Sequence, residues 1–305
     1  MTDMTIIILT RDEEANIRRC IESVKGLAKR IVVVDSGSTD KTVDIAKSLG
    51  ADTYYNPWKH YAGQFNWALD NTNIQTKWVF RFDADECMTP ELFNEIEEEC
   101  NKHQNDNVHA MMMRYKIFFL GKFLRHGGAY PFLKITIFKP EYGRFEDRAL
   151  GEHVVMREGE TIDLKNDCIH YDFKDLTSFV DKHNKYATRE LADYLDIHNG
   201  RQLEGLYGQP EKARKLRDNF YYKMPLFWRA KLYYWYRYYV RMGFLDGTPG
   251  KVFAFIQAYF YRFLVDAKIY ENRLGGGANY ELKIYSLEFR VNGAAASFVY
   301  GRMAA

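Results

Sequence analysis

The sequence predicts an α/β fold in which an open sheet is flanked by helices. Over about the first hundred residues, short apolar runs typical of strands alternate with segments whose apolar spacing is typical of helices. Two of these runs, Ile6–Leu9 and Ile31–Val34, are uninterrupted and rich in β-branched residues, as expected of parallel strands buried on both faces. The 305 residues, 47% of them hydrophobic, allow a sizeable core in one large domain or two smaller ones.

Apolar spacing and turn residues divide the first part of the chain. After Ile6–Leu9, apolar residues at helical spacing predict a helix over Glu13–Lys25. Asp35–Asp40 is a polar loop that ends in a helix cap, and Thr89-Pro90 starts a later helix because proline is favoured in a first turn. The other expected elements are helices over Thr42–Leu49 and Ala62–Asn71, and strands over Ala51–Tyr55 and Lys77–Phe82.

The pattern changes from Ala110 onward, where we expect a mixed extension of the same sheet. The glycine-rich loop Arg125–Pro131 interrupts its strands, and Gly243–Gly250 forms a turn between two later helices. The pattern does not place the tail that begins at Gly275. The expected strands are Met111–Phe119, Lys134–Phe138 and Val154–Met156, and the expected helices are Leu176–Leu195, Pro225–Met242 and Gly250–Tyr270.

Cysteine usage and the amino-terminal sequence indicate a cytoplasmic location. The chain has four scattered cysteines and no C-x-x-C pair, which favours free thiols in a reducing compartment over a disulfide framework or a zinc site. The first residues lack the basic start and long apolar stretch of a signal peptide. No uncharged apolar run reaches the roughly 18 residues expected of a membrane-spanning helix.

The acidic motif Asp83-Ala84-Asp85-Glu86 directly follows the expected strand Lys77–Phe82. Carboxylates this close repel one another, and each raises the pKa of the other unless a cation neutralises them. A divalent metal that carries a diphosphate is a natural neutraliser, because hard cations prefer carboxylate and phosphate oxygens. The motif therefore indicates chemistry on a nucleoside diphosphate, with a solvated acidic turn as the alternative.

Three polar clusters are expected at the carboxyl ends of the strands, where open α/β sheets bind their ligands. They are Thr10–Glu14, Asp35–Asp40 and Asp83–Glu86. Asp35–Ser38 taken alone also fits a structural turn and cap. A Rossmann dinucleotide site is discounted, because no G-x-G-x-x-G follows the first strand. Three clusters at one edge favour a nucleotide site.

Several segments resemble glycosyltransferase family 2, within the subgroup of bacterial lipopolysaccharide-core β-glucosyltransferases and related cell-envelope enzymes. The resemblance runs from about residue 4 to residue 271. It implies a GT-A fold, a nucleotide-sugar donor, a divalent metal and inversion at the anomeric carbon. The segments that carry it are TRDEEANIRRCIESV, IVVVDSGSTDKTVDIAKSLGA, FRFDADE, LRHGGAYPFLKITIFKP, HYDFKDLTSFVDKHNKYAT and MGFLDGTPGKVFAFIQAYFYRFLVDAK.

The resemblance assigns roles in the donor half of the site. Asp83 would contact the ribose or a metal-bound water, and Asp85 would ligate Mn²⁺ or Mg²⁺ on the diphosphate. The metal would neutralise the charge of the leaving nucleoside diphosphate without a proton. Cationic help could come from Arg81, Arg125 or Lys134. The pocket for the base and ribose would be lined by Thr10, Glu13 and Asp35, with Ser36 and Ser38 nearby.

An inverting transfer also needs a base that faces the acceptor hydroxyl. The candidates are Glu146, Asp147 and Glu152, and the resemblance favours Glu152. The alternative is that Glu152 caps a turn or pairs with Arg148. His170, at an expected strand end, is either a core histidine or a late metal ligand of the kind found in some GT-A enzymes.

The glycine-rich loop is expected to bind the acceptor or the donor sugar. Its glycines allow close backbone approach, and its tyrosine can stack on a sugar face. The alternative is a structural turn with one exposed histidine. The residues concerned are His126, Gly127, Gly128 and Tyr130.

The last third of the chain is basic and aromatic. Residues 201–305 contain 17 Lys or Arg and 8 Asp or Glu, a net charge of +9, whereas residues 1–200 have a net charge of −7. Aromatic rings and cations over residues 225–270 suit the headgroup zone of an anionic membrane. The alternative is an ordinary core or an interface of a homo-oligomer. Nucleic acid as a partner fits poorly with an acidic edge.

These inferences combine into an inverting, metal-dependent glycosyltransferase at the cytoplasmic face of the membrane. It would move a hexose, with glucose from UDP-glucose favoured, to a lipid-linked or lipopolysaccharide-type acceptor. Alternatives are an NDP-sugar nucleotidyltransferase, which would normally need a glycine-rich triphosphate loop, and a non-catalytic nucleotide-binding scaffold. We expect a GT-A domain over residues 1–200, a helical extension over 201–274 and a tail over 275–305.

Overall fold

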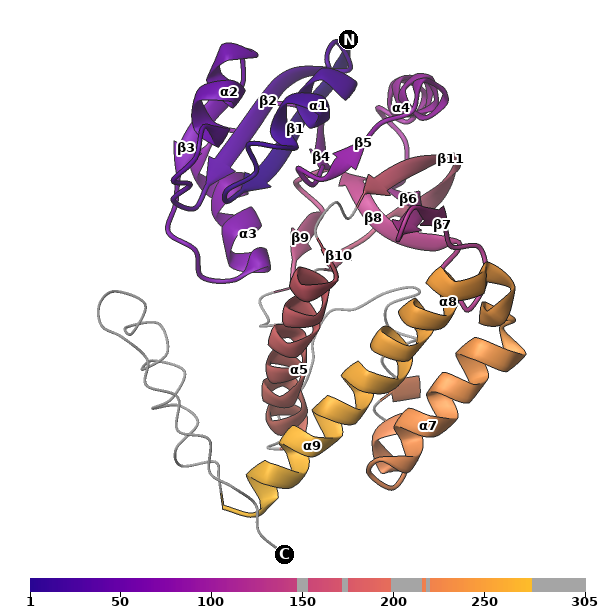
Figure 1. Cartoon of the computed structure of the whole chain (residues 1–305). Coiled ribbons are helices and arrows are strands. Elements are labelled where there is room, and N and C mark those ends of the chain that lie inside the picture. Colours follow the sequence, from indigo (N-terminus) through magenta and orange to yellow (C-terminus); the bar gives the residue numbers. More distant parts are fainter. Residues whose placement is uncertain (147–152, 172–174, 199–215, 218–219, 276–305) are drawn as a thin grey trace, which may run out of the picture.

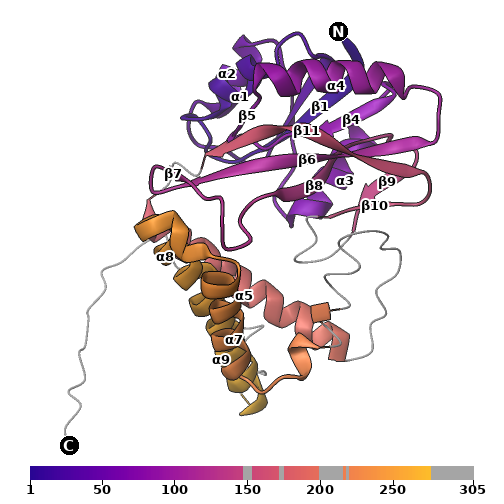
Figure 2. The same ribbon diagram turned by 90° about the vertical axis from the view of Figure 1, so that its right-hand side faces the viewer.

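A computed structural model describes residues 1–146, 153–171, 175–198, 216–217 and 220–275. The first part of the chain forms a curled sheet with helices on both faces (Figure 1). Viewed at right angles, the later helices α5, α7 and α9 group together on the side of the sheet opposite α4 (Figure 2). The expected combination of an open mixed sheet with a helical extension is therefore confirmed.

The described residues form a nine-stranded sheet in the order β3-β2-β1-β4-β8-β6-β11-β5, with β7 paired to β6. Strands β1 to β4 run parallel, β8 is antiparallel to β4 and β6, and β11 is parallel to β6. The strands are β1 Thr2–Thr10, β2 Ala28–Asp35, β3 Asp52–Tyr55, β4 Trp78–Arg81, β5 Glu86–Cys87, β6 Val108–Phe119, β7 Lys122–Phe123, β8 Phe132–Phe138 and β11 Glu160–Tyr171.

Alternate residues of β1 face two separate cores. Ile6 and Ile8 pack with the buried faces of α1 (Ile17–Ser23), α2 (Thr42–Ser48) and α4 (Pro90–Lys102). Ile7 packs on the other face with α3 (Tyr61–Asn71). Because both faces are covered, the strand has no polar face, which explains its uninterrupted apolar sequence.

Three expectations about elements were wrong in detail. The first helix begins at Ile17 rather than Glu13, because the Glu13 carbonyl accepts hydrogen bonds from the Asn16 and Ile17 amides in a turn that precedes it. The strand β10 (Val154–Met156) does not extend the main sheet and instead pairs with β9 (Gly143–Phe145) in a separate two-stranded sheet. The short strands β5, β7 and β9 were not expected, and of the largely polar β11 only the end at His170 was expected.

The helical unit after the sheet is built from α5 (Leu176–His198) and the segments from residue 221 onward. Buried residues of α5 and α9 share one apolar cluster, so α5 packs with the later helices. The two helices expected over 225–242 and 250–270 are present, but each contains a π-helical segment. In order, the segments are η1 Tyr221–Lys223, α7 Trp228–Trp235, π-helix η2 Tyr236–Val240, η3 Gly243–Asp246, α8 Gly247–Ala254, π-helix η4 Phe255–Phe260 and α9 Tyr261–Arg273.

A buried ion pair joins α7 to α9. Arg229 and Asp266 are both fully buried, and the Arg229 Nε atom donates to Asp266 Oδ1 at 2.7 Å. The second carboxylate oxygen accepts from the Phe227 amide at 2.7 Å. Removing one partner would leave the other as an uncompensated buried charge, which is far more costly than losing a surface pair.

We predict that Asp266→Ala lowers the free energy of unfolding by about 3–5 kcal/mol, measured by urea denaturation. The matched control is Asp70→Ala, which breaks the bidentate pair of Asp70 with Arg144 on the surface, where the two side chains are 53% and 43% exposed. The control should cost less than about 1 kcal/mol. Similar losses for the two variants would contradict the importance of the buried pair.

Candidate functional site

Residues from β1, β2 and β4 meet at one edge of the sheet. Thr10 and Asp35 are neighbours in the pairing of β1 with β2, and β4 runs parallel to β1. The Phe82 amide donates to the Ile7 carbonyl at 3.1 Å, which brings the acidic motif after β4 to the same edge. The three polar clusters expected to lie together therefore do so.

The Asp35 carboxylate is held in place by the loop that follows it. Thr10 and Ser38 hydroxyls donate to Oδ1 at 2.9 and 2.5 Å, and the Gly37 and Ser38 amides donate to Oδ2 at 2.9 and 2.8 Å. Burial opposes ionisation, but the hydrogen bonds from Ser38, Gly37 and Thr10 together lower the pKa of Asp35 below its ordinary value. The result is a fixed, ionised carboxylate at the sheet edge.

The loops after β1 and β2 are joined by further hydrogen bonds. Ser36 donates its hydroxyl to the Thr10 carbonyl at 2.9 Å, and Ser38 accepts from the Asp12 amide at 2.8 Å. The Glu13 carboxylate accepts from the Asn16 side chain at 2.8 Å, just before α1. The predicted base and ribose residues are thus brought together, and in the described structure they also stabilise the two loops.

Asp83 is fixed by a buried arginine and by a tyrosine that the sequence did not reveal. Arg81 donates from Nη2 to Asp83 Oδ2, and Tyr61 donates to Oδ1, both at 2.6 Å. Burial favours the protonated acid, but the charges of Arg81 and Lys134 and the Tyr61 hydrogen bond hold the pKa of Asp83 well below its usual range. Arg81 is 2% exposed, so it positions Asp83 from behind.

Asp85 lies beside His170, the histidine that the sequence left between a core residue and a metal ligand. Antiparallel pairing of β11 with β5 sets His170 opposite Glu86 and brings its Nε2 atom 3.2 Å from Asp85 Oδ2. Burial opposes charge on both groups, but their mutual interaction raises the pKa of His170 and lowers that of Asp85. Both side chains are about a quarter exposed, at 26% and 28%, so a ligand can reach them.

Glu86 is the third carboxyl group of the motif and is 1% exposed. Its Oε2 atom accepts from the Asp83 amide at 3.2 Å. Burial and the nearby negative charge of Asp83 raise the pKa of Glu86 to about 8, against the partial compensation of Arg81, His170 and Lys134. At neutral pH the motif Asp83–Glu86 therefore carries two carboxylates and one carboxylic acid.

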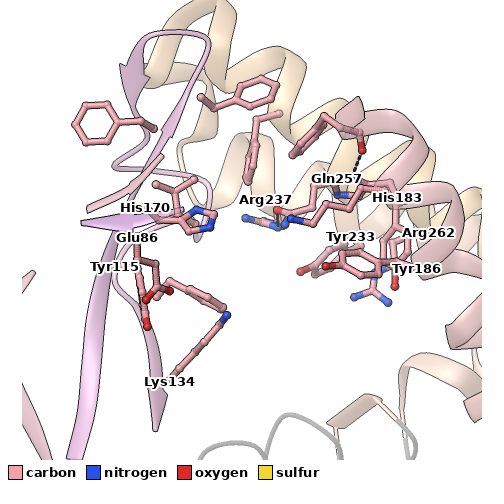
Figure 3. A pocket seen from close by; sticks show the side chains of 18 residues that line it. Glu86, Tyr115, Lys134, His170, His183, Tyr186, Tyr233, Arg237, Gln257 and Arg262 are labelled. Carbon is pink, nitrogen blue, oxygen red and sulfur yellow. Dashed lines mark hydrogen bonds between the residues drawn. The ribbon is translucent and has the colours of Figure 1, made fainter. Parts of the chain in front are cut away.

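A cleft of about 320 Å³ opens next to Glu86 and His170. One wall comes from the sheet and the other from the helical unit, so the cleft joins the two parts of the chain (Figure 3). The sequence singled out Glu86, Lys134 and His170 on the sheet wall but did not pair them with the residues of the helical wall, because the two walls come from segments about a hundred residues apart. The residues labelled in the figure are Glu86, Tyr115, Lys134, His170, His183, Tyr186, Tyr233, Arg237, Gln257 and Arg262.

The glycine-rich loop lies against the helical unit. His126 donates its amide to Asp246 Oδ2 at 2.8 Å, and its Nδ1 atom lies 2.9 Å from Oδ1. The Gly127 carbonyl accepts from Arg237 Nε at 2.5 Å, and the Gly127 amide donates to the Arg241 carbonyl at 2.7 Å. Tyr130 is turned elsewhere, since its hydroxyl donates to Asp167 at 3.0 Å. These contacts give the loop an anchoring role, and sugar binding by it stays a prediction.

The favoured catalytic base, Glu152, and its alternative Asp147 lie outside the described residues. Glu146 is described, and its amide donates to the His153 carbonyl at 3.1 Å where the chain approaches β10. The choice of base therefore stays a prediction.

The curled mixed sheet, its flanking helices and an acidic carboxyl edge define a GT-A-like protein. The family model described as "Glycosyl transferase family 2" matches residues 5–157. A glycosyltransferase of Rickettsia typhi, named as uncharacterized, is 30% identical over 282 residues, covering 89% of this chain and 88% of the relative. The chain belongs to glycosyltransferase family 2, which confirms the resemblance and makes it a glycosyltransferase.

Other similar proteins include the lipopolysaccharide core biosynthesis glycosyltransferase LpsC of Rhizobium meliloti. It is 25% identical over 275 residues, covering 88% of this chain and 92% of LpsC. A crystal structure of mannosyl-3-phosphoglycerate synthase from Rubrobacter xylanophilus matches with a TM-score of 0.43 and 16% identity, covering 69% of this chain and 79% of that one. Glucosyl-3-phosphoglycerate synthase from Mycobacterium tuberculosis, crystallised with Mn²⁺, UDP and phosphoglyceric acid, matches with a TM-score of 0.42 and 16% identity, covering 67% and 80%.

We predict that Gly127→Ala weakens the attachment of the loop to the helices. Gly127 has a φ of +63°, and an added Cβ would lie 3.2 Å from the Gly243 Cα atom. Gly121→Ala is the matched control, because its φ is +75° and nothing lies within 4 Å of the added atom. Both changes carry backbone strain of about 1–2 kcal/mol, and only Gly127→Ala adds overpacking of about 1 kcal/mol or more. Equal losses in urea denaturation would remove the anchoring role.

Proposed function

We propose that this glycosyltransferase is an inverting, metal-dependent enzyme that moves a hexose from a UDP-sugar, with UDP-glucose favoured, to a lipid-linked cell-envelope acceptor. The observation that carries the proposal is the contact of Asp85 with His170 at the sheet edge that also holds Asp35. The name of the relative LpsC, which assigns it to lipopolysaccharide core biosynthesis, supports an acceptor of the cell envelope.

The residues at this edge fit a divalent metal. Asp85 offers a carboxylate oxygen, which suits Mn²⁺ or Mg²⁺, and His170 would offer an imidazole nitrogen once the metal displaces its proton; both side chains are partly exposed. Within the described ranges, no group of three or more His, Cys, Asp or Glu residues could hold a metal ion. Two protein ligands would suffice when the diphosphate oxygens of the donor supply others. A bound metal would supply positive charge to the leaving diphosphate.

The protein's own residues would hold the donor around that position. Asp35 would accept hydrogen bonds from the base, because the pKa of its carboxyl is lowered and its oxygens are oriented by Ser38 and Thr10. Asp83, fixed by Arg81 and Tyr61, would accept from the ribose. Either Glu152 or Asp147 would accept the proton of the acceptor hydroxyl, on the face opposite the leaving diphosphate.

The helical unit would bring the enzyme to an anionic membrane surface. Large exposed hydrophobic side chains concentrate here, whereas the only two acidic residues between 228 and 270, Asp246 and Asp266, are buried. Among the described residues, no helix has the length and apolar character needed to cross a membrane. We call the exposed set the aromatic face: Trp228, Leu232, Trp235, Tyr236, Tyr239, Val240, Met242, Phe244, Leu245, Phe255 and Phe263.

Two of the cations expected to face the membrane are instead buried. Arg229 pairs with Asp266, and Arg237 donates to the Gly127 carbonyl and to Gln257. The cations that remain exposed beside the aromatic face are Lys231, Arg241 and Lys251. Membrane contact would therefore depend mainly on apolar side chains, with these three cations adding attraction to anionic headgroups.

We predict that nucleotide binding depends on metal and on Asp85. Differential scanning fluorimetry with UDP-, GDP-, dTDP- and CMP-sugars should show a rise in melting temperature with the UDP-sugar and Mn²⁺, and less without Mn²⁺. Asp85→Asn should remove the Mn²⁺-dependent rise and reduce release of UDP from UDP-glucose by at least roughly 100-fold. Asp70→Asn, an exposed carboxylate on α3, is the control.

Two results would defeat this assignment. The first is a melting temperature that no nucleotide raises in the wild-type protein. The second is an Asp85→Asn variant that keeps the Mn²⁺-dependent response of the Asp70→Asn control. A selective response to another nucleotide would correct the base of the donor and leave the metal position intact.

We also predict that the aromatic face binds anionic vesicles. Trp235→Ser should reduce flotation with vesicles that contain phosphatidylglycerol, because Trp235 is 56% exposed on this face. Tyr55→Ser is the matched control, since Tyr55 is 66% exposed on β3, at the opposite end of the sheet from the helical unit. A wild-type protein that does not float, or equal losses for the two variants, would exclude the membrane role.

A further inference from the structure

The cleft between the sheet and the helical unit is strongly cationic. Its lining contains four lysine or arginine side chains, against the single carboxyl group of Glu86. Glu86 lies at the sheet wall and is bonded to the Asp83 amide. The cationic side chains come from both walls, so the excess is a property of the cleft as a whole. They are Lys134, Lys182, Arg237 and Arg262.

Arg237 lacks a counter-charge within the described part of the chain. It is 9% exposed, and its bonded partners, the Gly127 carbonyl and the Gln257 side-chain amide, are both neutral. By contrast, Arg262 on the same wall pairs with Glu190 at 2.6 Å. A buried charge with neutral partners is costly unless an opposite charge joins it. An anion in the cleft would supply that charge.

Two other groups of the lining fit a ligand with anionic and polar parts. The Tyr115 hydroxyl on the sheet wall is buried and, among the described residues, has no hydrogen-bond partner. Lys182 is an exposed residue of α5 in the helical wall and lines the cleft, and its positive charge helps to lower the pKa of Asp85 across it. A buried hydroxyl without a hydrogen-bond partner also destabilises the protein, although it costs less free energy than an unpaired buried charge.

We propose that the acceptor which enters this cleft carries an oxyanion group, a phosphate or a carboxylate, and that Arg237 and Lys182 bind it. This inference rests on the proposed function, since it names the class of acceptor. A planar guanidinium held by Gly127 and Gln257 is already oriented, and an oriented guanidinium suits the oxygens of phosphate or carboxylate. A neutral sugar would leave Arg237 without a counter-charge.

The position of Arg237 also connects the cleft with the aromatic face. Tyr233 and Arg237 line the cleft, while Trp235, Tyr236 and Tyr239 of the same continuous helix are exposed on the aromatic face. A headgroup could therefore reach the cleft while its apolar part stays at the membrane. The oxyanion could belong to such a headgroup or to a soluble sugar phosphate, and the chemistry of binding is the same.

Calorimetric titration of the full chain tests the proposal. With UDP and Mn²⁺ present to occupy the donor site, glycerol 3-phosphate and glucuronate should bind, and glycerol and glucose should not. Lys182→Gln should weaken binding of the anions roughly tenfold, the loss of one charged hydrogen bond. The matched control is Lys185→Gln, an exposed lysine of the same helix that does not line the cleft, and it should change binding less than twofold.

Arg237→Gln should also weaken binding, with its melting temperature recorded because Arg237 anchors the Gly127 loop. If Arg237→Gln unfolds, the Lys182→Gln variant still tests the proposal. The proposal fails if neutral and anionic probes bind alike, if Lys182→Gln binds like wild type, if both lysine variants lose affinity together, or if UDP displaces the anions.

Two further experiments separate this proposal from the donor assignment and identify the source of the oxyanion. Titration without UDP and Mn²⁺ keeps this proposal distinct from the donor assignment, because anion binding that depends on Lys182 can persist in a protein that binds no nucleotide. Competition on vesicles that contain phosphatidic acid identifies the source of the oxyanion. Release of the protein by glycerol 3-phosphate assigns the oxyanion to a lipid headgroup, and unchanged vesicle binding assigns it to a soluble sugar phosphate.

Discussion

The acidic edge of the sheet depends on how three neighbouring carboxyl groups are accommodated at the end of one strand. Asp83, Asp85 and Glu86 lie within four residues, and like charges this close would destabilise the fold. Each group has a different solution: Asp83 is paired with buried Arg81, Asp85 with His170, and Glu86 stays protonated at neutral pH because the pKa of its carboxyl is raised to about 8. The short pairing of β5 with β11 is required for the second solution, since it brings His170 to Asp85. The acidic edge therefore depends on the antiparallel pairing of β5 with β11.

Hydrogen bonds made by charged side chains also hold the helical unit against the sheet. Asp246 accepts a hydrogen bond from His126, and Arg237 donates one to Gly127. Both of these hydrogen bonds join the helical unit to the same glycine-rich loop. The two π-helical segments η2 and η4 meet where Arg237 donates to Gln257 at 2.8 Å. A π-helical turn shifts the side chains that follow it relative to an α-helix, and such turns are frequent at functional sites. Here they occur where the helical wall forms one side of the cleft.

The acidic edge of the sheet could be predicted from the sequence because its residues follow strands that are recognisable by composition. Thr10, Asp35 and Asp83 each come directly after an apolar run, and parallel pairing alone brings them together. The cleft could not be predicted in this way, since Tyr115 and Arg237 meet only through the packing of distant segments. Tyr61 gave no signal either, as nothing local distinguishes it from other aromatic residues near a helix start. The basic character of the last third was read correctly, but sequence does not reveal which arginines are buried.

That distinction changes how the aromatic face should attract a membrane. Counted from the sequence, the last third has a net charge of +9, which would suggest binding dominated by electrostatics. Arg229, Arg237 and Arg262 are nonetheless engaged inside the protein, with Asp266, Gly127 and Glu190 as their partners. Each basic residue near an anionic surface contributes only about 1 kcal/mol, so a few exposed cations add modest attraction. In the proposed membrane contact, the larger contribution would come from the exposed tryptophan, tyrosine and leucine side chains, whose burial in the interface does not weaken as salt is added. Binding by this face should therefore depend less on ionic strength than the charge of the sequence suggests.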